Sequence, residues 1–163
     1  MNEPVAPLLV LAWGNPSRGD DALGPLLAER LLVHTEAAFL AGRVEVLTDF
    51  QLQVEHALDL VGRERVLFVD AALDLAEPFT VRPLQPARGG GLGSHALAPE
   101  AVLQVYQDLH GQAPPPSTLL AVRASAFELG TAPSVQALSD LDQAVVWACR
   151  WLSGEHIAEE VSA

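Results

Sequence analysis

This chain is poor in cysteine and in positive charge, and it contains no long apolar run. Its single cysteine, Cys149, excludes a disulfide framework and a thiolate metal site. The formal net charge of −12 disfavours binding to nucleic acid or to an anionic membrane surface. No apolar run reaches the roughly 18 residues that a membrane span needs. We therefore expect a soluble globular protein whose partners are proteins, cations or neutral molecules, with no nucleic acid and no membrane among them.

Signals for export and for a second domain are also missing. The first residues, Met1 to Pro4, lack the basic start of a secretory signal, which predicts a cytoplasmic location. The length of 163 residues is about that of one domain and can bury a sizeable core. We expect a single domain over residues 1–163, with the acidic end at 154–163 frayed.

The apolar pattern alternates between the period of a strand and the period of a helix. Short apolar runs predict strands at 8–13, 44–47, 66–69, 79–84 and 117–122. Between and after them, apolar residues three or four apart predict helices from 22, over 54–61, over 99–109 and over 138–152. Strands joined by helical crossovers form a mostly parallel sheet. The pattern therefore predicts an α/β fold, a twisted sheet of about five strands sandwiched between helices.

Two adjacent carboxylates, Asp20 and Asp21, lie in a glycine-rich turn at residues 14–24, directly after the first predicted strand. In an open α/β sheet this is the edge where ligands bind. Either aspartate could cap the helix that follows. The second one needs a cation or a hydrogen-bond donor to offset the repulsion between like charges. A phosphate loop fits poorly, because the turn carries two negative charges and neither the Walker lysine nor the GxGxxG spacing.

Two further residues are candidates for the same edge. Asp70 follows the most apolar strand and should sit at its carboxyl end, although it could also be a cap or turn aspartate. His95 follows a glycine-rich loop at 87–94 that is long enough to return to the sheet edge. If these groups meet Asp21, two oxygens and a nitrogen would suit zinc, nickel, manganese or iron.

The turn at 14–24, Asp70 at a strand end and His95 in a Ser-His context resemble the nickel-iron hydrogenase maturation endopeptidases. Members of that family remove a C-terminal extension from the hydrogenase large subunit. The resemblance covers about residues 8–152, and it implies that Asp21, Asp70 and His95 are the catalytic and metal-contacting residues. It also implies that the nickel is carried by the substrate, a large-subunit precursor.

Residues 48–53, Thr-Asp-Phe-Gln-Leu-Gln, depart from the glycine and threonine turn of many family members. Here the chain is similar to the branch that serves NAD-coupled bidirectional hydrogenases. We expect this segment to contact the substrate, with Asn15, Asp49 and Gln51 as substrate-binding residues. Asp49 could instead cap the helix predicted from Val54.

The sequence offers no motif for a covalent nucleophile. It has no Gly-x-Ser-x-Gly elbow and no HExxH pair, and Cys149 falls within a predicted helix. Peptide hydrolysis would need a carbonyl polarised by a metal or a water activated by a carboxylate. A binding module that holds a metal or a partner's tail without cutting it is the main alternative. A phosphatase is disfavoured, because Arg18 is the only cation in the turn.

Overall fold

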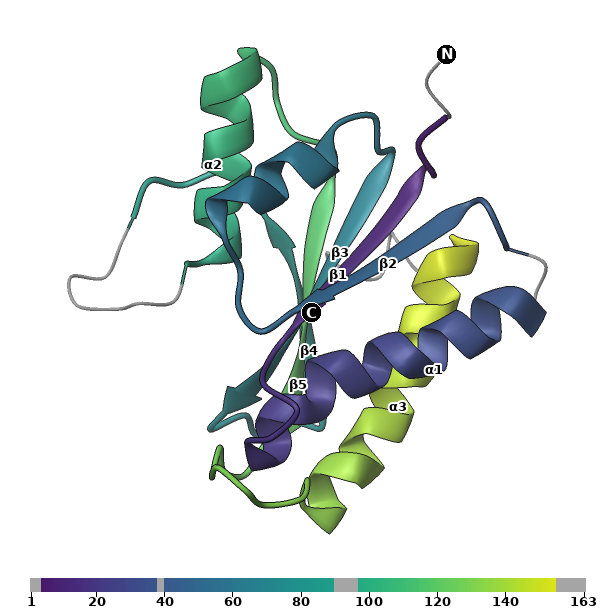
Figure 1. Ribbon diagram of the computed structural model, residues 1–163, viewed down its shortest axis with the longest axis vertical. Coiled ribbons are helices and arrows are strands. Elements are labelled where there is room, and N and C mark those ends of the chain that lie inside the picture. Colours follow the sequence, from purple (N-terminus) through teal and green to yellow (C-terminus); the bar gives the residue numbers. More distant parts are fainter. Residues whose placement is uncertain (1–3, 38–39, 90–96, 155–163) are drawn as a thin grey trace.

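The computed structural model describes residues 4–37, 40–89 and 97–154, which form one five-stranded sheet between helices (Figure 1). The strand order is β2-β1-β3-β5-β4, and only β4 runs antiparallel to its neighbour. The strands are β1 (Leu8–Trp13), β2 (Val44–Asp49), β3 (Arg65–Leu73), β4 (Phe79–Leu84) and β5 (Ser117–Ala124). The helices are α1 (Leu23–Ala37), α2 (Pro99–His110) and α3 (Val135–Ser153), with 3₁₀ helices η1 (Gly19–Ala22) and η2 (Val54–Leu60). The predicted α/β fold is confirmed.

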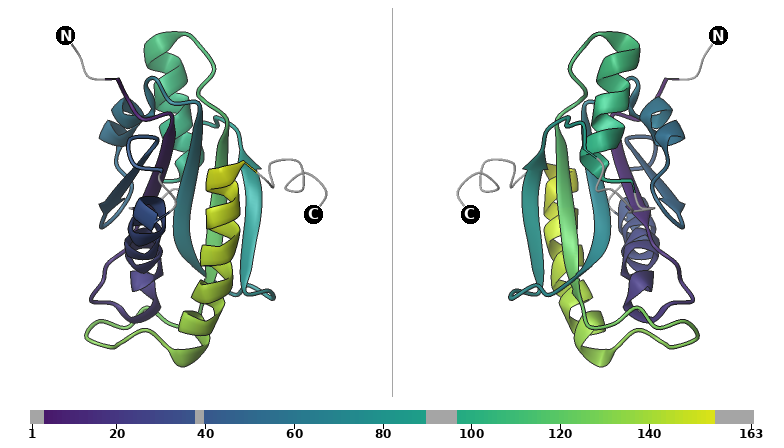
Figure 2. Two further views of the ribbon diagram at one scale, coloured as in Figure 1. Left: turned by 90° about the vertical axis from the view of Figure 1, so that its right-hand side faces the viewer. Right: turned by 90° about the vertical axis from the view of Figure 1, so that its left-hand side faces the viewer.

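Helices cover both faces of the sheet and make a three-layer sandwich. α1 and α3 lie on one face, and α2 and η2 lie on the other (Figures 1 and 2). Alternate residues of β1 point to opposite faces of the sheet, so that Val10 packs with α1 and α3 and Leu11 packs with α2 and η2. Every residue of β1 is buried, as expected for a central parallel strand. In the described part of the chain, no helix is both long and apolar enough to cross a bilayer.

The sheet topology creates a crevice beside β1. Its two neighbours, β2 and β3, are reached through connections that cover opposite faces of the sheet, which is where ligands bind in open α/β folds. The register sets Trp13 opposite Asp49 of β2, and it sets Ala12 opposite Val69, so that Trp13 is also beside Asp70. The ends of β1 and β2, together with Asp70 inside β3, therefore bring an indole and two carboxylates to one edge.

Two predicted elements differ in detail. β3 does not end at Asp70 but continues to Leu73, because it keeps pairing with β5 after β1 has ended. The segment predicted as a helix over 54–61 is a 3₁₀ helix, and its expected inner residues Val54 and Leu58 are exposed. With three residues per turn, Ala57 of the predicted inner face is buried as expected, and His56 and Leu60 are buried with it.

The inner face of α3 also differs from the predicted apolar stripe. Small residues, Ala144 and Ala148, are fully buried at its centre, whereas Cys149 and two of the larger stripe residues, Leu138 and Val145, are only half-buried. Small side chains allow a helix axis to approach a neighbouring layer closely. The larger side chains therefore fill the flanks of the contact.

Candidate functional site

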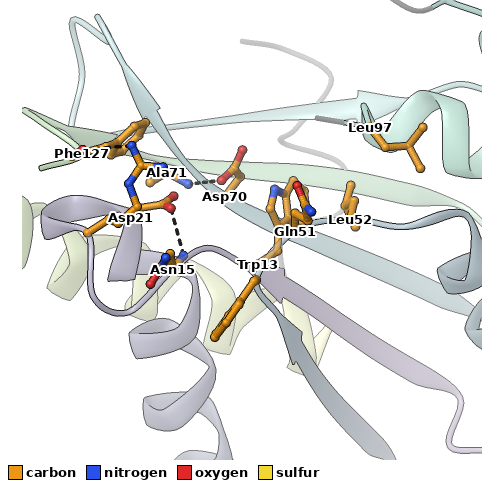
Figure 3. A pocket seen from close by; sticks show the side chains of 11 residues that line it. Trp13, Asn15, Asp21, Gln51, Leu52, Asp70, Ala71, Leu97 and Phe127 are labelled. Atoms are coloured by element: carbon orange, nitrogen blue, oxygen red, sulfur yellow. Dashed lines mark hydrogen bonds between the residues drawn. The ribbon is translucent and has the colours of Figure 1, made fainter. Parts of the chain in front are cut away.

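A pocket of about 420 Å³ opens at the carboxyl edge of the sheet, beside the end of β1 (Figure 3). Its walls come from the turn after β1, from η1, from the segment after β2, from β3 and from the loop after β5. The lining residues are Trp13, Asn15, Arg18, Asp21, Phe50, Gln51, Leu52, Asp70, Ala71, Leu97 and Phe127. Of the residues selected from the sequence, the pocket thus brings together Asn15, Asp21, Gln51 and Asp70.

Asp21 is held at the pocket by the tight turn after β1. The backbone N–H of Asn15 donates to Oδ2 of Asp21 at 2.9 Å. Gly14 has a φ of +147°, and a Cβ built there would lie 2.0 Å from the carbonyl oxygen of Asp21, so only glycine fits. Figure 3 shows the Asp21 side chain next to Asp70 in the pocket wall.

Asp20 points away from the pocket and has a different role. Only 1% of the residue is exposed, and its carboxylate accepts hydrogen bonds from the Ser125 N–H, the Ser134 N–H and the Ser134 hydroxyl. Burial alone would raise the pKa of Asp20, but these hydrogen bonds outweigh it and hold the pKa below its usual value. Asp20 therefore ties the turn to the loop between β5 and α3.

The prediction that one of the two aspartates caps the helix that follows them is wrong. No side chain caps η1, and Asp21 accepts from Asn15, which precedes the helix. The reason is tertiary: residues from the far end of the chain supply donors for Asp20, and the turn itself supplies the donor for Asp21.

Asp70 is a half-buried carboxyl in the wall of the pocket. Its Oδ1 accepts the Ala71 N–H at 2.8 Å, and the Trp13 side chain also forms a hydrogen bond with it. Burial, together with the negative charge of Asp21, raises the pKa of Asp70 to about 7 despite these hydrogen bonds. A carboxyl with this pKa can take up or release a proton near neutral pH, which suits a general acid or base.

The pair of carboxylates fits a cation. Two negative charges that share a pocket repel each other, and a bound cation would remove this cost. Within residues 4–37, 40–89 and 97–154, no three His, Cys, Asp or Glu side chains form a group that could hold a metal. The third predicted ligand, His95, lies outside the described residues.

Asp49 lies beside the pocket rather than in its lining. It contributes to a second, adjoining cavity of about 280 Å³, lined by Gly14, Pro16, Pro25, Thr48, Asp49 and Phe50. Its Oδ1 accepts the Phe50 N–H at 2.7 Å, and its Oδ2 lies 3.3 Å from Nε2 of His56. Asp49 is therefore not the cap of η2, whose N-cap residue is Gln53.

Sequence reasoning missed three aromatic residues and one histidine of this region. Trp13 could have been found, because the end of β1 must lie beside Asp70 in a parallel sheet. Phe50 belongs to the segment 48–53 that we expect to contact the substrate, but the sequence does not single it out there, and Phe127 lies in a loop and carries no motif. His56 carries no motif either, and its position between Asp49 and Gln53 follows only from the fold.

Several solved structures share this fold. The hydrogenase maturation protease HycI from Thermococcus kodakarensis matches with a TM-score of 0.66 and 22% identity, over 90% of this chain and 92% of that one. The hydrogenase maturating endopeptidase HybD from E. coli matches with a TM-score of 0.66 and 21% identity, over 90% and 93%. A hydrogenase 2 maturation peptidase from a thaumarchaeon matches with a TM-score of 0.62 and 21% identity, over 89% of this chain and 97% of that one.

These matches establish that the chain has the fold of hydrogenase maturation proteases. No family model matches the chain, and no curated protein is similar to it in sequence. What the chain does must therefore be argued from its own pocket.

Proposed function

We propose that this protein is an endopeptidase that removes the C-terminal extension of a nickel-iron hydrogenase large-subunit precursor. The observation that carries the proposal is the pair Asp21 and Asp70 in one pocket, with the pKa of Asp70 raised to about 7. The shared fold with HycI and HybD supports it, because those proteins are described as maturation proteases or endopeptidases.

The two aspartates have different tasks in this proposal. Asp21, fixed by the Asn15 N–H, supplies a carboxylate that attracts a cation carried by the precursor. Asp70 in its ionised form takes a proton from water as the water oxygen attacks the scissile carbonyl carbon. It then returns this proton to the leaving nitrogen when the C–N bond breaks. Oδ1 of Asp70 accepts the Ala71 N–H at 2.8 Å, which orients the carboxyl group in the pocket wall.

Nickel enters the proposal as part of the substrate. Carboxylate oxygens from Asp21 and Asp70, with the imidazole of His95 as the expected third ligand, form a donor set that a divalent cation of this type accepts. A nickel-loaded precursor would then be recognised by its metal, which explains how a small protease could avoid cutting other proteins. Asn15 and Gln51, which line the same pocket, would contact the polypeptide around the cleaved bond.

We further propose a branch of substrate and a cellular location. Segment 48–53 is the basis for proposing a precursor from an NAD-coupled bidirectional hydrogenase, and none of the three structures compared above is described as serving that branch. A cytoplasmic location is proposed because the precursor would have to meet the enzyme before the hydrogenase is finished.

The test is incubation of the protein with a nickel-loaded precursor and with the same precursor stripped of nickel, followed by mass measurement of both products. We expect one cut in the loaded precursor and none in the stripped one. Binding of the loaded precursor without any cut would contradict the protease assignment and support a binding module of the same fold. Cleavage of the stripped precursor at the normal rate would contradict recognition through nickel and leave Asp21 and Asp70 as a metal-free acid and base.

A further inference from the structure

Residues 49–53, which run from the last residue of β2 to the residue before η2, are held at both ends by one imidazole. The N–H of Gln53 donates to Nδ1 of His56 at 2.9 Å. On the other side of the ring, Nε2 lies 3.3 Å from Oδ2 of Asp49. His56 is therefore a bridge across the base of a short loop, and only 9% of the residue is exposed.

The hydrogen bond to Gln53 determines where the imidazole proton is. Because Nδ1 accepts from the Gln53 N–H, the neutral ring carries its proton on Nε2, which faces the Asp49 carboxylate. Asp49 is fixed in turn, since its Oδ1 accepts the Phe50 N–H and its carbonyl accepts the Gly14 N–H at 3.0 Å. The bridge thus links the loop to the turn that carries Asp21.

The loop displays two side chains between fixed ends. Leu52 is 4% exposed and anchors the loop in the core, whereas Phe50 is 68% exposed and Gln51 is also exposed. Phe50 lines both the pocket of Asp21 and Asp70 and the adjoining cavity formed with Pro16 and Pro25. The pocket holds two carboxylates and the guanidinium of Arg18, and two of the six residues that line the adjoining cavity are prolines. An exposed aromatic ring between them suits a ligand that has both a cation and an apolar side chain.

We infer that His56 is a positioning residue, which holds residues 49–53 in the shape that grips an extended polypeptide across Phe50. This inference rests on the proposed function. The substrate would place its cationic part beside Asp21 and Asp70 and a neighbouring apolar side chain in the cavity beyond Phe50. The Gln51 amide would hydrogen-bond its backbone, since an amide side chain can both donate and accept.

Three substitutions separate the two contacts of the ring. His56→Leu removes both contacts. His56→Asn keeps an acceptor near the position of Nδ1 for the Gln53 N–H, and His56→Gln keeps a donor near the position of Nε2 for Asp49. His110→Asn is the matched control, because His110 is an exposed histidine at the C-terminal end of α2.

The primary measurement is the steady-state kinetics of precursor cleavage. For His56→Leu we expect KM to rise about tenfold while kcat stays within about twofold, because binding is lost and the reacting carboxyls are untouched. His56→Asn and His56→Gln should each recover part of this loss, and His110→Asn should match the wild type.

A second measurement tests whether His56 acts through Phe50. Phe50→Ala should raise KM as His56→Leu does, and the double variant should be no worse than the poorer single variant, since both remove the same grip. Amide exchange should show faster exchange of the Gln53 N–H in His56→Leu and His56→Gln but not in His56→Asn.

The outcomes distinguish this inference from the proposed function. If the wild type cuts the precursor but His56→Leu leaves KM unchanged, or lowers kcat alone, the positioning role is wrong and the protease assignment stands. Losses in His56→Leu and Phe50→Ala that multiply in the double variant would also overturn it. If the wild type neither binds nor cuts the precursor, both fail together.

Discussion

The carboxylate of Asp20 accepts both the N–H and the hydroxyl of Ser134, a residue 114 positions further along the chain. The same hydroxyl oxygen accepts the Ala137 N–H and so caps α3. One buried carboxylate therefore holds the end of the pocket turn and the start of the last helix in a fixed relation. The adjacent Asp21 is left to face the pocket.

Replacement of Asp20 by asparagine should therefore destabilise the protein. It removes the charge that three donors share, and hydrogen bonds to a charged group contribute about 1.5–3 kcal/mol each. We expect a loss of about 3 kcal/mol in the free energy of unfolding at pH 7, measured by urea denaturation.

The pH dependence gives the control for this variant. Because the pKa of Asp20 is lowered in the folded state, its contribution is present above the unfolded pKa of about 3.8 and is lost as the pH falls through the folded value. The difference between wild type and Asp20→Asn should therefore shrink in acid. A difference that stays constant from pH 7 to pH 2 would contradict the role of the charge.

Asp21→Asn should lower the activity of the protein and leave its stability almost unchanged. An amide oxygen can still accept the Asn15 N–H, so the unfolding free energy should change by less than about 1 kcal/mol. Processing of the precursor should fall at least about a hundredfold, because the charge that attracts the substrate's cation is gone. If Asp20→Asn abolishes cleavage without loss of stability while Asp21→Asn cleaves normally, the two roles have been assigned the wrong way round.

Asp70 should make the wild type less stable as the pH rises. Its pKa is about 7 in the folded state and about 3.8 in the unfolded state, so the folded state holds its proton more tightly. The stability that this group contributes is greatest below about pH 4 and is lost as the pH rises through about 7. The total loss in the free energy of unfolding is up to about 4 kcal/mol.

Asp70→Asn removes this ionisation and should be more stable than wild type at pH 8, as measured by thermal or urea unfolding. It should also be inactive, since an amide cannot take a proton from water. For the wild type, kcat/KM should rise with pH through about 7 as Asp70 ionises. A wild-type rate that is flat from pH 5 to pH 9 would exclude Asp70 as the base.

Cys149→Ser should remain active. Burial raises the pKa of the Cys149 thiol, which makes it a poor nucleophile, and the residue lies near Leu40 and His34 rather than at the pocket. We expect a loss of about 1 kcal/mol in stability from the hydroxyl group. Reagents that modify active serines or cysteines should leave cleavage intact, and full inhibition by such a reagent would reveal a nucleophile that this site does not include.

The strands and the acidic pocket could be predicted because they depend on local patterns. Val66 to Val69 is apolar throughout, which indicates a strand buried on both faces, and Asp70 follows directly. The partners of Asp20 could not be predicted, since Ser125 and Ser134 are more than a hundred residues away. The burial of His56 could not be predicted either, because it depends on η2 being a 3₁₀ helix with three residues per turn.

β3 continues past Asp70, so sequence changes near Asp70 and sequence changes near Phe50 should have different consequences. The proposed proton carrier is built into a strand that pairs with β5 both before and after it, so sequence changes in the surrounding loops barely move it. Phe50 and Gln51, by contrast, lie on a short exposed segment whose side chains can be exchanged without disturbing the sheet. A lineage of such proteins could therefore acquire new precursors by altering that segment alone, while the reaction itself stays the same.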